Sequence, residues 1–157
     1  MPVDKEAKFN PIISPAMAKR PHMDRYAIGD TADFAKTVTE YDVYAFAGIV
    51  GDFYGVHLNE EHAKTTRFKT RIAQGTLSVG FLSTVMGYMA AKAPNPGAVS
   101  HRYDITFDEP VYFGDTLTAK LVLREKDEER NTCTFTATVT NQHGTVVASG
   151  STYLKVL

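Results

Sequence analysis

The chain has 157 residues, of which 43% are apolar and 22% charged, so it is long enough for one well-packed domain and lacks the composition of a disordered protein. Its 17 basic and 18 acidic residues give a net charge of -1, which provides no overall field to attract nucleic acid. A single cysteine, Cys133, excludes an internal disulfide and a cysteine-based metal cluster, and it favours a cytoplasmic setting.

The first predicted segment, residues 1–25, combines four prolines with mixed charges and shows no regular periodicity. This pattern predicts an extended arm in front of a single domain over residues 26–157. The arm lacks the apolar stretch of a signal peptide, and no run of about 18 apolar residues occurs in the chain. We therefore expect neither export nor insertion into a membrane.

A strand is predicted over residues 34–38, followed at once by a helix. Thr39 and Asp42 have the spacing of an N-cap residue and an acidic third residue, and apolar residues at helical spacing continue to Val50. Gly51 is placed to end this helix.

The stretch 52–57 contains a glycine and no helical period, so we expect a loop that leaves the end of the preceding helix. Asn59 is expected to cap a further short helix over residues 60–64, where two acidic residues lie near the positive end of the helix dipole. A basic connector, residues 65–71, follows.

The second half of the chain begins with a long apolar helix and continues as strands. Residues 75–91 carry apolar side chains on nearly every side, which predicts a helix buried by a sheet. In residues 132–140 apolar side chains alternate with threonines, as in a half-buried strand, and Cys133 lies on the apolar face. Polar turns over residues 128–131 and 141–144 indicate an antiparallel meander. The expected fold is therefore α+β, with a curved sheet around a central helix, which is the hot-dog architecture.

Asp52 and His57 are the first candidates for chemistry because they lie five residues apart in one predicted loop. An imidazole can take up and return a proton near neutral pH, and a carboxylate can orient it or a water molecule. The spacing alone is weak, since an aspartate after a helix-ending glycine also serves as a turn former.

The start of the apolar helix offers a second candidate. The N–H of Gly75 has no partner within the helix and lies at the positive end of its dipole, which suits a developing negative oxygen. Equally, the glycine can simply allow close packing. Ser83, two turns further on, is placed either to support this site or to pack.

These residues occur in an order that resembles the MaoC-like family and its (R)-specific enoyl-CoA hydratases. The resemblance rests on Asp-x-x-x-x-His from Asp52, then Thr66-x-Phe68, Arg71-Ile72-Ala73, Gly75 and Ser83, and later Phe107-x-x-Pro110-Val111 and Gly114-Asp115-x-Leu117. It implies that Asp52 and His57 activate a water molecule, that the Gly75 N–H polarises a thioester carbonyl, and that Ser83 supports the site. It further implies reversible hydration of a trans-2-enoyl-CoA to an (R)-3-hydroxyacyl-CoA, without a cofactor or a metal.

Three residues, at two places in the sequence, depart from the family pattern. The family loop usually has Asn-Pro where this chain has Tyr54 and Gly55, and the hydratases usually have histidine where this chain has Gln74. Tyr54 and Gln74 are therefore candidates for altering the substrate pocket. The departures bear on the choice of substrate more than on the type of reaction.

Three basic residues, Arg67, Lys69 and Arg71, either bind the phosphates of coenzyme A or form a solvated connector. His101 has no partner at metal-ligand spacing, so we expect no metal site.

Two other functions remain open. The first is an acyl-CoA thioesterase, because the same fold can present a carboxylate and a helix N-terminus to a thioester. The second is an acyl-CoA-binding or partner subunit without its own activity, which the departures at Tyr54, Gly55 and Gln74 keep open. The edge of a hot-dog sheet and an apolar helix end both need cover, which predicts a homodimer or a higher homo-oligomer with acyl channels at or near the interface.

Overall fold

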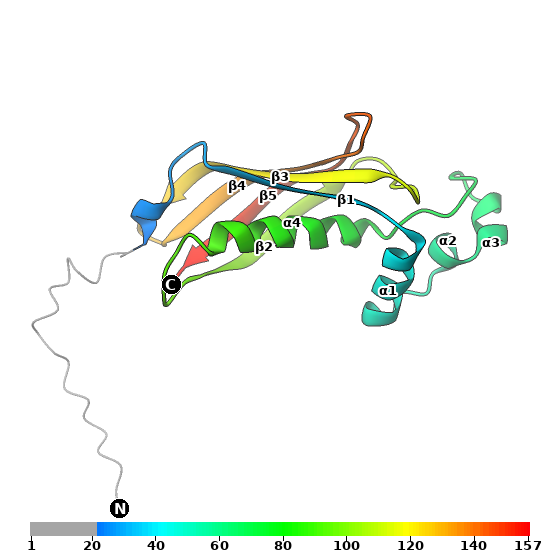
Figure 1. Cartoon of the computed structure of the whole chain (residues 1–157), viewed down its shortest axis with the longest axis horizontal. Helices are drawn as coiled ribbons and strands as arrows, with labels where there is room; N and C mark the ends of the chain where they lie inside the picture. Colours follow the sequence, from blue (N-terminus) through cyan, green and yellow to red (C-terminus); the bar gives the residue numbers. More distant parts are fainter. Residues whose placement is uncertain (1–21) are drawn as a thin grey trace, which may run out of the picture.

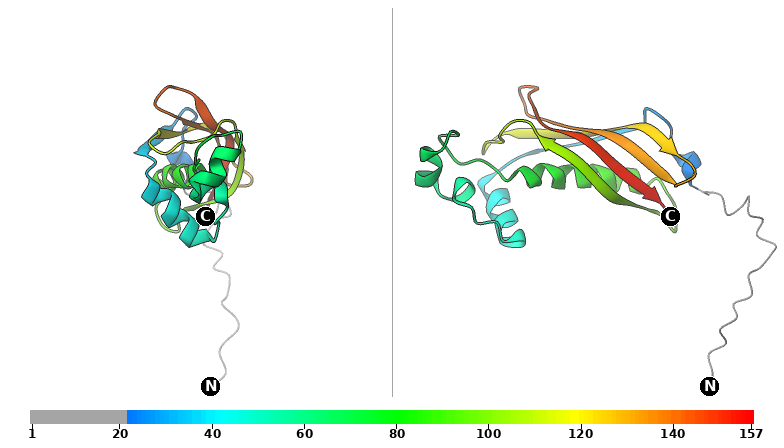
Figure 2. Two further views of the ribbon diagram at one scale, coloured as in Figure 1. Left: turned by 90° about the vertical axis from the view of Figure 1, so that its right-hand side faces the viewer. Right: turned by 180° about the vertical axis from the view of Figure 1, so that it is seen from behind.

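The computed structural model describes residues 22–157 as one antiparallel sheet with a long helix, α4, lying along one face (Figures 1 and 2). The sheet has the strand order β1-β3-β4-β5-β2. In chain order the elements are a 3₁₀ helix (Met23–Arg25), β1 (Thr31–Thr37), α1 (Glu40–Val50), α2 (Gly55–Leu58), α3 (Glu60–Thr65), α4 (Gly75–Ala90), β2 (Ala98–Phe107), β3 (Thr116–Asp127), β4 (Thr132–Thr140) and β5 (Val146–Val156). The predicted α+β class is confirmed.

The core lies between the sheet and α4. Strand β4 has the bounds predicted from its alternation, and its inward side chains Cys133, Phe135, Ala137 and Val139 are fully buried. Strands β3, β4 and β5 pair consecutively, so the expected meander is confirmed. Burial raises the pKa of the Cys133 thiol to about 11, which keeps it in its neutral, unreactive form.

Strands β2 and β5 approach each other closely at Gly150. A Cβ atom added at this position would lie 2.0 Å from the carbonyl oxygen of Asp104, and the φ angle of 151° is one that other residues rarely adopt. Only glycine fits this point of the pairing. The close pairing continues to Phe107, at the end of β2, which faces Ala148 of β5.

Helix α4 is buried on only one side, so the prediction of a helix enclosed all round is wrong for the single chain. Phe81, Leu82, Val85, Met86 and Met89 are buried, whereas the positions facing away from the sheet are exposed and mostly small (Thr76, Gly80, Ser83 and Gly87). A single sheet can cover only one face of a helix. The hydropathy pattern does not reveal the uncovered face, because small residues have hydropathy values near zero and do not mark it as polar.

The three short helices α1, α2 and α3 project past one end of the sheet, next to the N-terminus of α4 (Figure 2). The capping box predicted at Thr39 and Asp42 is present, and Gly51 ends α1 in the left-handed conformation with a φ angle of 79°. Asn59 caps α3 through its side chain, as expected. The expected loop over residues 52–57 is correct only for its first part, because α2 begins at Gly55.

Most of the predicted N-terminal arm lies outside the described residues. Its last part differs from the expectation, since Met23 belongs to a 3₁₀ helix and is buried in the core with the neighbouring Tyr26. Within residues 22–157, no helix has the length and hydropathy needed to cross a lipid bilayer.

Candidate active site

His57 lies on α2 and is held in one orientation by a backbone carbonyl. Its Nδ1 atom is 2.8 Å from the carbonyl oxygen of Ile72, and its side chain is only 11% exposed. A carbonyl oxygen can only accept, so Nδ1 carries the proton and donates it. In the neutral imidazole, Nε2 is then the unprotonated nitrogen and is able to act as a base.

Asp52 lies on the Nε2 side of this imidazole. Its Oδ2 atom is 3.8 Å from Nε2 of His57, which is too long for a hydrogen bond and short enough for both groups to contact one small molecule. The other carboxylate oxygen accepts from the backbone N–H of Tyr54 at 3.3 Å, which fixes the turn out of α1. The predicted pair is therefore brought together, with the carboxylate 40% exposed.

A cavity of about 550 Å³ opens beside His57. Its lining includes the first residue of α4, side chains from the connector before α4 and side chains from the end of β2, and among them are His57, Arg67, Gly75, Ser78, Phe107 and Val111. Asp52 is not part of this lining. The cavity therefore has an imidazole and a helix N-terminus in its wall, and the Asp52 carboxylate lies outside the lining at 3.8 Å from the imidazole.

Gly75 begins α4, so its backbone N–H has no acceptor within the helix. A Cβ atom here would lie 3.0 Å from two ring carbons of Phe107, closer than ordinary contact. The structure thus explains the glycine by close packing, one of its two possible roles. Gly75 also lines the cavity, so close packing and a role for its N–H are compatible.

Ser83 is not brought to the cavity. It is exposed on α4, whereas Ser78 is buried and lines the cavity. At about 100° per residue, Ser78 is turned about 60° from Gly75 in one direction and Ser83 about 80° in the other, so the two serines point about 140° apart around the helix. Only one of the two serines can therefore face the cavity, and the lining shows that it is Ser78. The cavity-lining acidic residues Asp108 and Glu109 were also missed, and no sequence signal marks them.

Of the three basic candidates, one lines the cavity and two do not. Arg67 lines the cavity, and its guanidinium carbon lies 4.8 Å from the centre of the Phe68 ring. Lys69 is exposed in a turn with a φ angle of 64° and is not part of the lining. Arg71 is tied into ion pairs with Glu40 and Glu60 away from the cavity.

None of the residues at the two departures from the family pattern, Tyr54, Gly55 and Gln74, is in the cavity lining. Tyr54 is exposed, and its ring packs edge-on against His57 and His62 with centroid separations of 6.0 and 5.8 Å. The His62 ring fills the space beside Gly55, where a Cβ atom would lie 2.9 Å from it. Gln74 is buried outside the cavity lining and donates from its amide to the carbonyl of Val43 at 3.4 Å, which joins α1 to the start of α4.

Among residues 22–157, no three histidine, cysteine, aspartate or glutamate side chains are grouped so that they could hold a metal ion. His101 instead packs its ring against Tyr153 on β5.

A family model described as "MaoC like domain" matches residues 25–145. The chain belongs to the MaoC-like domain family. It is 42% identical to the (R)-specific enoyl-CoA hydratase of Rhodospirillum rubrum over 82% of this chain and 86% of that protein. It is 35% identical to the 3-hydroxybutyryl-CoA dehydratase of Methylorubrum extorquens over 82% of this chain and 80% of that protein.

Among solved structures, the unliganded R-hydratase of Pseudomonas aeruginosa matches this MaoC-like chain with a TM-score of 0.72 and 33% identity, over 83% of this chain and 82% of that one. The family resemblance and the hot-dog fold predicted from the sequence are both confirmed.

Proposed function

We propose that this MaoC-like protein is a hydro-lyase, an (R)-specific enoyl-CoA hydratase or 3-hydroxyacyl-CoA dehydratase, which adds water reversibly to a trans-2-enoyl thioester. The observation that carries the proposal is the fixed orientation of His57, whose Nδ1 is bonded to Ile72 so that Nε2 is free beside Asp52. The names of the relatives that match most of the chain support the same reaction.

The proposed reaction needs one base, one acid and a group that stabilises negative charge. A water molecule held between Asp52 and His57 adds its oxygen to C3 of the enoyl group while Nε2 takes its proton. The electron pair of the double bond moves toward the thioester oxygen, where the Gly75 N–H at the positive end of α4 stabilises it. The imidazolium then returns the proton to C2, and His57 is regenerated.

Coenzyme A enters this proposal as part of the substrate, and no cofactor takes part in any step. Arg67, at the cavity wall, is placed to contact a phosphate of the coenzyme A portion, with Lys69 on the same exposed connector. The exposed ring of Tyr54 is placed to contact the substrate where it passes His57. Gln74 influences the pocket only indirectly, through the position of α4.

We further propose that the chain forms a homodimer and works in the cytoplasm, where a free thiol such as Cys133 stays reduced. Large apolar side chains on α1 and just after it, including Tyr41, Ile49 and Phe53, are exposed. Such a surface is typical of a protein–protein contact. Sedimentation at about micromolar concentration, a range typical of specific association, is expected to show a dimer, and a monomer there contradicts this proposal.

The function is tested by hydration of crotonyl-CoA with the wild type, Asp52→Asn and His57→Gln, with chiral analysis of the product. We expect the wild type to form the (R)-3-hydroxy product and each variant to lose at least about a hundredfold in kcat, the usual scale for a general acid-base group. Folded variants with wild-type rates contradict the assignment of the two residues. Release of free thiol supports a thioesterase instead, and tight binding of acyl-CoA without turnover supports a non-catalytic subunit.

A further inference from the structure

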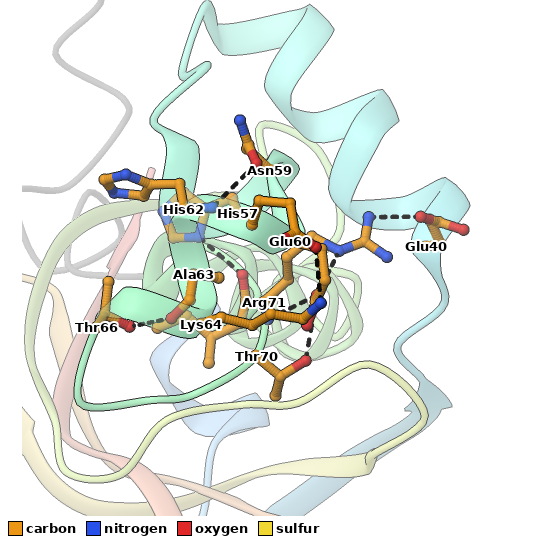
Figure 3. Close-up of polar contacts among 12 residues, drawn as sticks. Glu40, His57, Asn59, Glu60, His62, Ala63, Lys64, Thr66, Thr70 and Arg71 are labelled. Carbon is orange, nitrogen blue, oxygen red and sulfur yellow. Dashed lines mark hydrogen bonds and ion pairs between the residues drawn. The ribbon is translucent and has the colours of Figure 1, made fainter.

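Arg71 joins the helices around the candidate active site to one another. Its Nε atom donates to Glu60 of α3 at 3.1 Å, and one terminal nitrogen donates to Glu40 of α1 at 2.6 Å and to the Tyr44 hydroxyl at 2.7 Å. The guanidinium also lies 4.8 Å from the centre of the Phe113 ring. Figure 3 shows Arg71 between Glu40 and Glu60.

The backbone around Arg71 is bonded to the segment that carries His57. The N–H of Arg71 donates to Glu60 at 3.3 Å. The next residue, Ile72, donates its N–H to the carbonyl of Val56 at 3.2 Å and accepts from Nδ1 of His57 at 2.8 Å. Glu60 thus accepts from both the side chain and the backbone N–H of Arg71, the residue before Ile72.

Helix α2, which carries His57, has only four residues and cannot be stable on its own. Its orientation therefore depends on contacts with residues far along the chain. The segment over residues 71–72 provides such contacts, because the Ile72 carbonyl accepts from His57. The N–H of Arg71 donates to Glu60, which lies on α3, the helix that follows α2.

The ion pairs at Arg71 differ from ordinary surface pairs in the burial of the guanidinium and in the number of its carboxylate partners. The side chain of Arg71 is only 20% exposed and has two carboxylate partners, and the hydrogen bond to Glu40 is the main cause that raises its pKa. Partial burial acts to raise the pKa of Glu60, but hydrogen bonds from Thr70 and Arg71 outweigh it and lower that pKa below its usual value. A planar guanidinium can bridge two carboxylates in this way, whereas isolated exposed pairs contribute little.

We propose that Arg71, together with Glu60, is a positioning residue that holds the Ile72 carbonyl where it fixes the orientation and tautomer of His57. This inference rests on the proposed catalytic role of His57. It also reassigns Arg71, which the sequence suggested as a phosphate ligand. Its donors face Glu40, Glu60 and Tyr44, and it is not part of the cavity lining, whereas Arg67 is.

The test compares Arg71→Gln and Glu60→Gln with a matched control, Glu61→Gln. Glu61 is the next residue on α3 and is also paired, with Lys64 at 2.7 Å, but that pair is exposed and makes no link to Ile72. The first readout is the ¹⁵N spectrum of the histidine rings at about pH 8, where neutral imidazole predominates. The His57 signals are assigned among the five histidines by their loss in His57→Gln.

We expect the wild type and Glu61→Gln to show His57 protonated only at Nδ1. In Arg71→Gln and Glu60→Gln we expect His57 signals averaged between the two tautomers. In hydration assays, kcat is expected to fall by about tenfold to a hundredfold with KM unchanged, because a displacement near 1 Å costs up to about a hundredfold. Arg71→Lys is expected to recover part of the loss, since an ammonium can pair with one carboxylate but cannot bridge both in a fork.

The inference is overturned if folded Arg71→Gln and Glu60→Gln keep the wild-type His57 spectrum, which would mean that the backbone bonds of Ile72 suffice. It is also overturned if Arg71→Gln raises KM alone, which would identify Arg71 as a substrate ligand. If Arg71→Gln does not fold, Glu60→Gln decides the outcome. The spectrum needs no turnover, so failure of the proposed hydratase activity is seen separately in the wild-type assay.

Discussion

Replacing Gly75 with alanine tests whether the start of α4 is part of the reactive site. The added methyl would lie 3.0 Å from two ring carbons of Phe107 and 3.1 Å from a third. Carbon atoms prefer separations of about 3.5 to 4.0 Å, so the ring and the helix start must move apart by about 0.5 to 1 Å. Both groups line the cavity, and either movement changes the geometry around a bound thioester.

The expected effect falls on catalysis more than on folding. A misplacement of about 1 Å costs up to about a hundredfold, so kcat/KM for enoyl-CoA hydration is expected to fall by about tenfold to a hundredfold in Gly75→Ala. The Phe107 side chain is 49% exposed and can turn aside. Alanine also favours the helix, so the free energy of unfolding should change by less than about 1 kcal/mol.

The assay is a double-mutant comparison of Gly75→Ala, Phe107→Leu and the two together, with kcat/KM and urea unfolding measured for each. Leucine is smaller than phenylalanine and restores the missing space, so the double variant is expected to be more active than Gly75→Ala alone. Wild-type activity in Gly75→Ala, or a double variant that is no better than Gly75→Ala, refutes the reasoning from close packing.

Two further predictions concern stability. A hydrogen bond with Arg71 lowers the pKa of Glu40, and hydrogen bonds with Thr70 and Arg71 outweigh burial and lower that of Glu60, in each case below the ordinary value of 4.5. The stabilising contribution of the two carboxylates is therefore fully present above that pH and is lost as the pH falls through the folded-state pKa values. Urea unfolding between about pH 6 and pH 3 is expected to show this loss, with a shallower dependence in Glu60→Gln; an equal dependence would contradict it. Gly150→Ala is expected to cost more than about 3 kcal/mol, because its methyl would lie 2.0 Å from the carbonyl oxygen of Asp104, and near-wild-type thermal unfolding would contradict the close pairing of β2 with β5.

The local structure of much of the described chain follows from the sequence. The capping box at Thr39, the left-handed end of α1 at Gly51 and the alternation of β4 are all present. Each depends on residues that are neighbours in the chain, so the responsible side chains and their spacing are visible without a fold. The pair Asp52 and His57 belongs to this group, because a short segment of chain keeps its members near each other.

The tertiary structure determined which side chains and surfaces contact each other. It covered only one side of α4, brought Ser78 to the cavity in place of Ser83, and bound Arg71 to Glu40 across 31 positions of sequence. The acceptor that fixes His57 is a backbone carbonyl, which every residue possesses, so no residue type marks it in the sequence. Periodicity and spacing specify the conformation of a segment, whereas the partner of a side chain depends on how distant segments pack, and that information is not contained in any one stretch of the chain.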